Sequence, residues 1–132
     1  MEATKPVIVR RAPESLNLKQ ARAFMEEIRP LLGRDRPQIV FDLSQLRKID
    51  SAGIEMLVQC MHEAVRRDGD LKLAALSPQA QMMLELTRTA RLFEVFATPA
   101  EAVRSFSGYQ PNMVRQFHRR AEAERAPARK VA

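Results

Sequence analysis

The sequence has few of the residues that build disulfide scaffolds or cross membranes. It holds a single cysteine, Cys60, so no disulfide can form within the chain, and a reducing compartment such as the cytoplasm is predicted. No apolar run approaches the roughly 18 residues that a membrane span requires. The N-terminus also lacks the apolar stretch of a signal peptide. These absences argue against a secreted protein, a membrane-spanning protein and a disulfide-stabilised scaffold.

Recognisable catalytic patterns are absent as well. The two histidines, His62 and His118, have no metal-ligand spacing, and His62 is interpreted as an ordinary residue on a helix surface. There is no Gly-x-x-x-x-Gly-Lys phosphate loop and no Gly-x-Ser-x-Gly nucleophile motif. The sequence therefore predicts a protein that is not an enzyme and that needs neither a cofactor nor a metal.

What the chain does carry is an uneven excess of positive charge. Its 132 residues contain 22 Lys and Arg against 16 Asp and Glu, a net charge of +6. Residues 107–132 hold six of the basic and two of the acidic groups, so residues 1–106 have a net charge of only +2. We expect one domain over 1–106 and a basic, flexible tail over 107–132.

Three interpretations of the tail remain open. It is either a solvated end, a segment that contacts nucleic acid or a membrane surface, or a segment that contacts an acidic partner. Its only aromatic residues are Tyr109 and Phe117, which gives bases little to stack on. No direct contact with nucleic acid is therefore expected.

Apolar periodicity predicts strands alternating with helices along residues 1–106. The expected strands lie near 7–9, 39–43, 71–75 and 93–96, and the expected helices over 18–32, 51–68, from 78 and 99–106. Alternation of this kind is typical of an α/β fold. We expect a mainly parallel, or mixed, central sheet of four to five strands with about four helices.

Two details of the expected helices can be tested. Pro30 lies inside the first helical pattern and is expected to kink that helix or end it early. In the second helix Met56, Cys60 and Ala64 form an apolar stripe beside the main one. That stripe indicates either a helix buried on two sides or a surface that faces a partner; for Cys60 itself, buried packing is expected.

The connection after residues 39–43 is where a functional site is expected. Ligands of parallel α/β sheets gather at the carboxyl ends of strands, beside the N-termini of helices. Here the strand leads through Ser44 to Asp50 into Ser51, at the start of the second helix. The positive end of a helix dipole suits an anion, including a phosphate attached to the serine itself. In the alternative interpretation, Asp50 or Ser51 merely caps the helix.

A longer stretch of sequence resembles a known family. Residues 39–58 read IVFDLSQLRKIDSAGIEMLV, which is similar to the signature region of STAS domains, especially those of anti-sigma factor antagonists. The shared pattern is a hydrophobic strand ending in Asp-Leu-Ser, a short connection, then Asp-Ser, a small residue, Gly and a Leu-rich helix. The resemblance extends over about residues 5 to 106 and implies a STAS-like fold.

The resemblance also implies a function. Ser51 would be the phosphoacceptor of a partner serine kinase that has an ATPase-type fold and is itself the anti-sigma factor. The unphosphorylated protein would bind this kinase and free the sigma factor. Phosphorylation would reverse the binding, and a phosphatase would restore it. The neighbours of the acceptor and the partner-binding residues would be Asp42, Asp50, Ala52, Gly53, Glu55 and Asn17.

Three positions depart from the family pattern. Asn17 stands where an Asp is common, Ala52 replaces a frequent Ser or Thr, and Glu55 replaces a frequent Gly. A second function remains open beside the switch. The chain could be a STAS scaffold or a regulatory subunit of a lipid or ABC-type transport assembly, with Ser51 acting only as a cap.

Overall fold

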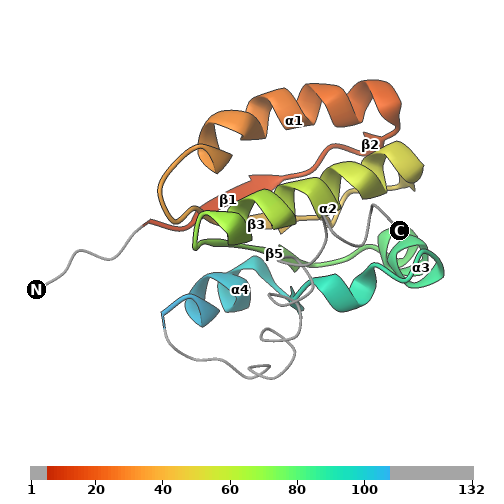
Figure 1. Cartoon of the computed structure of the whole chain (residues 1–132). Coiled ribbons are helices and arrows are strands. Elements are labelled where there is room, and N and C mark those ends of the chain that lie inside the picture. Colours follow the sequence, from red (N-terminus) through yellow and green to blue (C-terminus); the bar gives the residue numbers. More distant parts are fainter. Residues whose placement is uncertain (1–5, 108–132) are drawn as a thin grey trace, which may run out of the picture.

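A four-stranded parallel sheet lies at the centre of the computed structural model, which describes residues 6–107 (Figure 1). The strand order is β1-β3-β5-β6, with bounds β1 (Ile8–Arg11), β3 (Gln38–Asp42), β5 (Asp70–Ala74) and β6 (Val95–Phe96). The helices are α1 (Leu18–Leu32), α2 (Ser51–Arg66), α3 (Pro78–Leu86) and α4 (Pro99–Ser105), with a 3₁₀ turn η1 (Ala90–Leu92). The predicted fold class is confirmed. The expected tail, apart from Ser107, lies outside the described residues.

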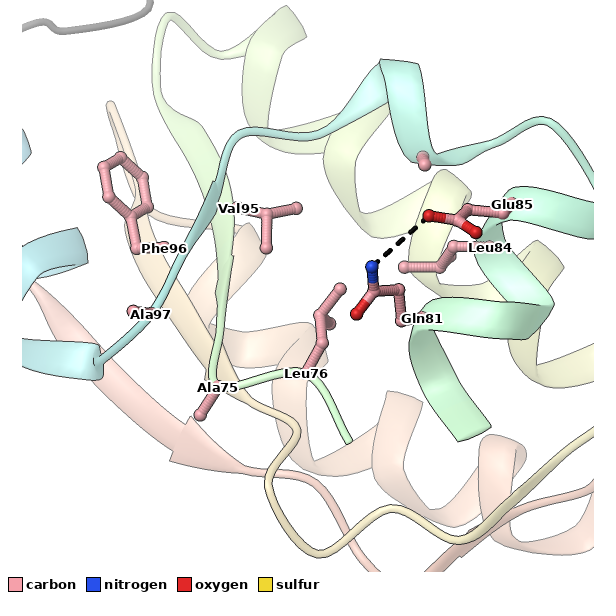
Figure 2. Close-up of a pocket in the computed structure, with 9 residues that line it drawn as sticks. Ala75, Leu76, Gln81, Leu84, Glu85, Val95, Phe96 and Ala97 are labelled. Carbon is pink, nitrogen blue, oxygen red and sulfur yellow. Dashed lines mark hydrogen bonds between the residues drawn. The ribbon is translucent and has the colours of Figure 1, made fainter. Parts of the chain in front are cut away.

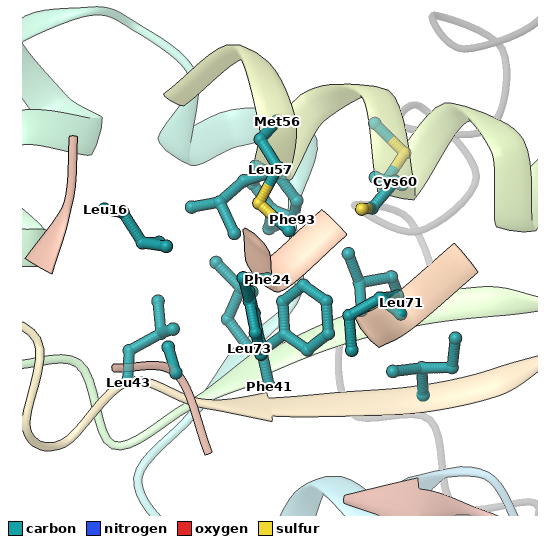
Figure 3. Packing of buried hydrophobic residues seen from close by; sticks show 14 of the residues in the cluster. Leu16, Phe24, Phe41, Leu43, Met56, Leu57, Cys60, Leu71, Leu73 and Phe93 are labelled. Atoms are coloured by element: carbon teal, nitrogen blue, oxygen red, sulfur yellow. The ribbon is translucent and has the colours of Figure 1, made fainter. Parts of the chain in front are cut away.

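The helices α1 and α2 cover one face of the sheet and form the main core (Figures 1 and 3). The Phe24 ring of α1 packs on the Phe41 ring of β3, with 5.2 Å between their centroids. The second stripe of α2 is buried throughout, and its Cys60 Sγ lies 3.7 Å from Met25 Sδ of α1. The stripe therefore belongs to a helix that is buried against both the sheet and α1.

Pro30 does not end α1 early, contrary to that part of the prediction. The helix continues to Leu32, and the Gly33 N–H closes it by bonding to the Arg29 carbonyl at 3.2 Å. Because Pro30 falls in the last turn, the N–H that it lacks would have made one of the final hydrogen bonds of the helix. The core contacts of Leu31 and Leu32 hold the turn in place.

The opposite face of the sheet is covered by α4 and carries a buried charge. Lys72 of β5 is fully buried, and its Nζ lies 3.1 Å from Glu94 Oε1 and 2.6 Å from Ser105 Oγ. The same ammonium group stands over the Phe106 ring, 4.2 Å from its centroid. The ion pair joins β5 to the residue before β6. Besides a small apolar cluster on this side, the hydrogen bond from Lys72 to Ser105 and the contact with Phe106 link α4 to the sheet.

Two stretches differ from the predicted strand pattern. The strand expected over 93–96 is reduced to β6, because η1 ends directly before Phe93. The expected connection over 44–50 contains a short strand, β4 (Lys48–Ile49), which pairs in parallel with β2 (Ser15–Leu16). Strands of two residues show no period-two pattern, so sequence periodicity could not identify this second sheet.

Candidate functional site

The small β2–β4 sheet brings the N-termini of α1 and α2 together. Leu16 pairs with Ile49, and the residue that follows each of them is a helix N-cap. Asn17 Oδ1 accepts a hydrogen bond from the Gln20 N–H at 3.2 Å, and so caps α1 as expected. The predicted neighbours Asn17 and Asp50 thus follow paired strands, at the end of the molecule where α3 also lies (Figure 1).

Asp50, and not Ser51, caps α2. The Asp50 Oδ1 accepts hydrogen bonds from the backbone N–H groups of Ala52 at 2.9 Å and Gly53 at 3.2 Å. Ser51 is the first residue of the helix and is exposed, and its hydroxyl bonds to no residue within 6–107. The hydroxyl is therefore accessible at the positive end of the α2 dipole.

Gly53 lets the first turn of α2 lie directly on the small sheet. A Cβ at this position would stand 2.2 Å from the Leu16 carbonyl oxygen and 2.7 Å from Ile49 Cγ1. No side chain fits at such distances, so glycine is required for this close approach. The half-buried Ala52 precedes it, and the exposed Glu55 follows four residues after Ser51, on the same side of the helix.

Asp42 holds the start of the connection that leads to Ser51. Its Oδ1 accepts the Ser44 N–H at 2.9 Å, and its Oδ2 lies 3.7 Å from Nε of the exposed Arg11. Among the described residues no hydrogen bond joins Asp42 to Ser51. The proximity of these two side chains thus stays a prediction, and the contacts of Asp42 show a structural part in the turn.

The rest of the connection is tied to the segment between β1 and β2. Gln45 Nε2 donates to the Ala12 carbonyl at 3.1 Å. The N–H groups of Arg47 and Lys48 both bond to the Glu14 carbonyl, at 2.7 and 3.1 Å. Hydrogen bonds to the segment between β1 and β2 therefore hold the connection that leads to Ser51.

The exposed apolar residues of α3 were not identified from the sequence. Met82 and Leu86 are 60% and 71% exposed, four residues apart, on the side of the helix away from the buried Ala80 and Leu84. The signal was a second apolar pair at helical spacing, out of phase with the core pair. Since α3 and α2 both pack against β4, this pair and Ser51 belong to neighbouring elements.

A hollow of about 370 Å³ lies between α3 and the edge of the main sheet (Figure 2). Gln81 Nε2 donates to Glu85 Oε2 across its wall at 3.3 Å. The lining residues are Ala75, Leu76, Gln81, Leu84, Glu85, Ala90, Val95, Phe96 and Ala97. None of the predicted site residues lines this hollow, so it is separate from the surroundings of Ser51.

Burial also decides the chemistry of the single thiol. Removal from water raises the pKa of Cys60 from 9.0 to about 12, against a smaller lowering effect of the Arg29 charge. Residues 6–107 contain no group of three or more His, Cys, Asp or Glu side chains that could hold a metal ion. Over the same residues, no helix has the length and hydropathy to cross a membrane.

Comparisons with known proteins add a family and a set of related structures. The STAS domain family model matches residues 1–102. A comparison with curated proteins gives no significant match.

Three solved structures show how widely the fold is shared. The anti-sigma factor antagonist SpoIIAA in its unphosphorylated form is 19% identical over 82% of this chain and 95% of that one, with a TM-score of 0.67. An anti-sigma-factor antagonist (STAS) domain protein from Planctomyces limnophilus is 19% identical over 70% and 80%, with a TM-score of 0.63. The STAS domain of a SulP transporter from Vibrio cholerae is 15% identical over 77% and 83%, with a TM-score of 0.61. At these identities the likeness shows a shared fold.

Proposed function

This chain belongs to the STAS domain family, and we propose that it is a phosphorylation-switched protein-binding module of the anti-sigma factor antagonist type, not an enzyme. In this proposal residues 1–106 form the binding domain and 107–132 a basic tail. The unphosphorylated domain binds an anti-sigma serine kinase with an ATPase-type fold in the cytoplasm. Phosphorylation of Ser51 releases that partner, and a phosphatase reverses the step.

One observation supports this proposal above the others. The cap of α2 is supplied by Asp50, which leaves the exposed Ser51 hydroxyl without a hydrogen-bond partner among the described residues. A serine needed only as a cap would use its oxygen to accept a backbone N–H. The Ser51 hydroxyl has no such task and is open to an incoming kinase.

The charges around Ser51 explain how a phosphate would work as a switch. A phosphoserine adds about 1.5 to 2 negative charges at neutral pH. The α2 dipole favours that charge, which allows the modified protein to remain folded. Asp50 directly before Ser51 and Glu55 four residues later are acidic, so the phosphate would make this face strongly negative. An acidic partner surface would then be repelled by the phosphate. An apolar partner surface would have to strip water from the phosphate, which costs free energy.

The proposed partner surface combines this acidic region with apolar residues of a neighbouring helix. Met82 and Leu86 of α3 are largely exposed, and α3 packs on the same short strand, β4, that leads into Ser51. Apolar residues beside a charge switch are suited to a reversible interface, since the apolar contacts give affinity and the charge decides whether they form. The fold shared with SpoIIAA, which is named as an anti-sigma factor antagonist, supports the proposal by analogy.

The transport assembly is the second candidate. The likeness to the STAS domain of a SulP transporter supports it at the same level of fold. In that case Ser51 would carry no phosphate, and its neighbours would make a constant contact. The two functions therefore differ in whether modification of Ser51 changes binding.

The experiment is phosphorylation of the full chain by a candidate ATPase-type serine kinase with ATP, with the site mapped by mass spectrometry. We expect phosphate at Ser51, none in Ser51→Ala, and binding to the kinase that is lost in Ser51→Asp. Ser44→Ala is the matched control, because Ser44 is an exposed serine in the same connection. No phosphate at Ser51, together with equal binding of Ser51→Ala and Ser51→Asp, would exclude the switch and favour the scaffold.

A further inference from the structure

The hydroxyl of Ser77 joins two elements on either side of the proposed interface. Ser77 is the N-cap of α3, is buried, and accepts the Ala80 N–H at 3.2 Å. Its own proton is donated to the carbonyl oxygen of Leu46, which lies in the connection between β3 and β4. One hydroxyl thus both starts α3 and binds the segment that leads to Ser51.

The Leu46 carbonyl is well placed to transmit a displacement. Leu46 is fully buried, and its N–H bonds to the Leu43 carbonyl at 3.2 Å, which closes a tight turn. The next two residues bond to Glu14 and then enter β4, which ends at the α2 cap. Four positions therefore separate Leu46, which Ser77 contacts, from Asp50, along a backbone that is hydrogen-bonded to Glu14 and paired in β4.

We propose that Ser77 is a positioning residue that couples α3 to the connection carrying Ser51, so that a partner seated on Met82 and Leu86 acts on the acceptor. The coupling to phosphorylation rests on the proposed function, whereas the mechanical link does not. Without the Ser77 proton the buried Leu46 carbonyl loses its donor, and α3 and the connection are no longer held by a common hydrogen bond.

The chain contains a matched control for this residue. Thr98 caps α4 by accepting the Glu101 N–H at 3.1 Å, and Pro99 follows it as Pro78 follows Ser77. In the described part of the chain, the Thr98 hydroxyl makes no hydrogen bond to another element. Thr98→Ala therefore removes a cap of the same kind without removing a bridge. The Thr98 geometry also shows that threonine fits before proline at a helix start.

The test is amide hydrogen exchange of the full chain, observed at Leu46, Arg47 and Lys48. We expect exchange there to be about tenfold faster in Ser77→Ala, and unchanged in Thr98→Ala. Ser77→Thr keeps both the acceptor and the proton and should restore the original rates. Ser77→Asp keeps an acceptor but has no proton to donate at neutral pH, and should exchange as fast as Ser77→Ala.

Equal exchange in Ser77→Ala and Thr98→Ala would overturn the positioning role, as would Ser77→Thr variants that exchange like Ser77→Ala. The same proteins are then offered to the candidate kinase with ATP. We expect kcat/KM for Ser51 to fall in Ser77→Ala and to be retained in Thr98→Ala. If exchange responds as expected but no variant is phosphorylated, the mechanical link stands and the proposed function fails. If Ser51 is phosphorylated but exchange does not respond, the proposed function stands and the positioning role of Ser77 fails.

Discussion

Replacing Gly53 by alanine is expected to destabilise the protein, although this change within a helix usually stabilises. Alanine is favoured over glycine in a helix interior by about 1 kcal/mol. Here the added Cβ would lie 2.2 Å from the Leu16 carbonyl oxygen and 2.7 Å from Ile49 Cγ1. The nearest atom is backbone, so β2 and α2 must separate, and overpacking of this kind costs about 1–3 kcal/mol. Taking the upper value, the free energy of unfolding should fall by about 2 kcal/mol after the helix preference is subtracted.

Gly33→Ala is the control for the Gly53 variant. A Cβ at Gly33 would have its nearest neighbour at 3.7 Å, and the residue has φ −78°, which alanine adopts readily. That change should leave stability unchanged or raise it by about 0.4–1 kcal/mol. Urea unfolding followed by circular dichroism measures both variants. If Gly53→Ala proves as stable as Gly33→Ala, then the close contact between α2 and the small sheet is not what glycine is needed for.

Three further predictions use the same unfolding assay. Asp50→Ala should cost about 1 kcal/mol through loss of the α2 cap, and Asp50→Ser should recover most of it; equal stability of the three proteins would contradict the cap. Lys72→Met leaves the buried Glu94 unpaired and should cost about 3–5 kcal/mol, which Glu94→Gln in the same chain should largely restore; additive losses would count against the pair. Cys60 has a pKa of about 12 when folded and 9.0 otherwise, so the folded state keeps its proton longer and loses stability as pH rises. Between pH 9 and 12 the ionisation of Cys60 should lower the free energy of unfolding by about 1.4 kcal/mol per pH unit. A Cys60→Ala variant whose stability falls just as steeply over this range would refute the prediction.

The elements with a long apolar pattern were predictable. α1 begins after Asn17 and α2 begins at Ser51, as the spacing of their buried residues indicated. Such helices carry enough periodic residues for the pattern to stand out from chance. The prediction for Pro30 was wrong in part, since its effect depends on how many helical hydrogen bonds follow it, and that number depends on where the core contacts of Leu31 and Leu32 end the helix.

The grouping of site residues was predictable only in part. That Asp50, Ser51, Ala52 and Gly53 share one turn follows from their order in the chain. Whether Asp50 or Ser51 caps α2 was left open, because either side chain can accept the same backbone hydrogens. The structure assigns the cap to Asp50 by its bonds to Ala52 and Gly53.

The sequence by itself determined the alternation of strands and helices, the near neutrality of residues 1–106 and the place of Ser51 at the start of a helix. These are local properties, set by neighbouring residues along the chain. Only the tertiary structure decided that Asn17 and Asp50 follow paired strands, that Gly53 must lack a side chain, and that Ser77 binds Leu46. The pairing of Leu16 with Ile49, the approach of Gly53 to the Leu16 carbonyl and the bond from Ser77 to Leu46 each join residues at least 31 positions apart. Packing brings such residues together, and no local pattern in the sequence encodes their distance.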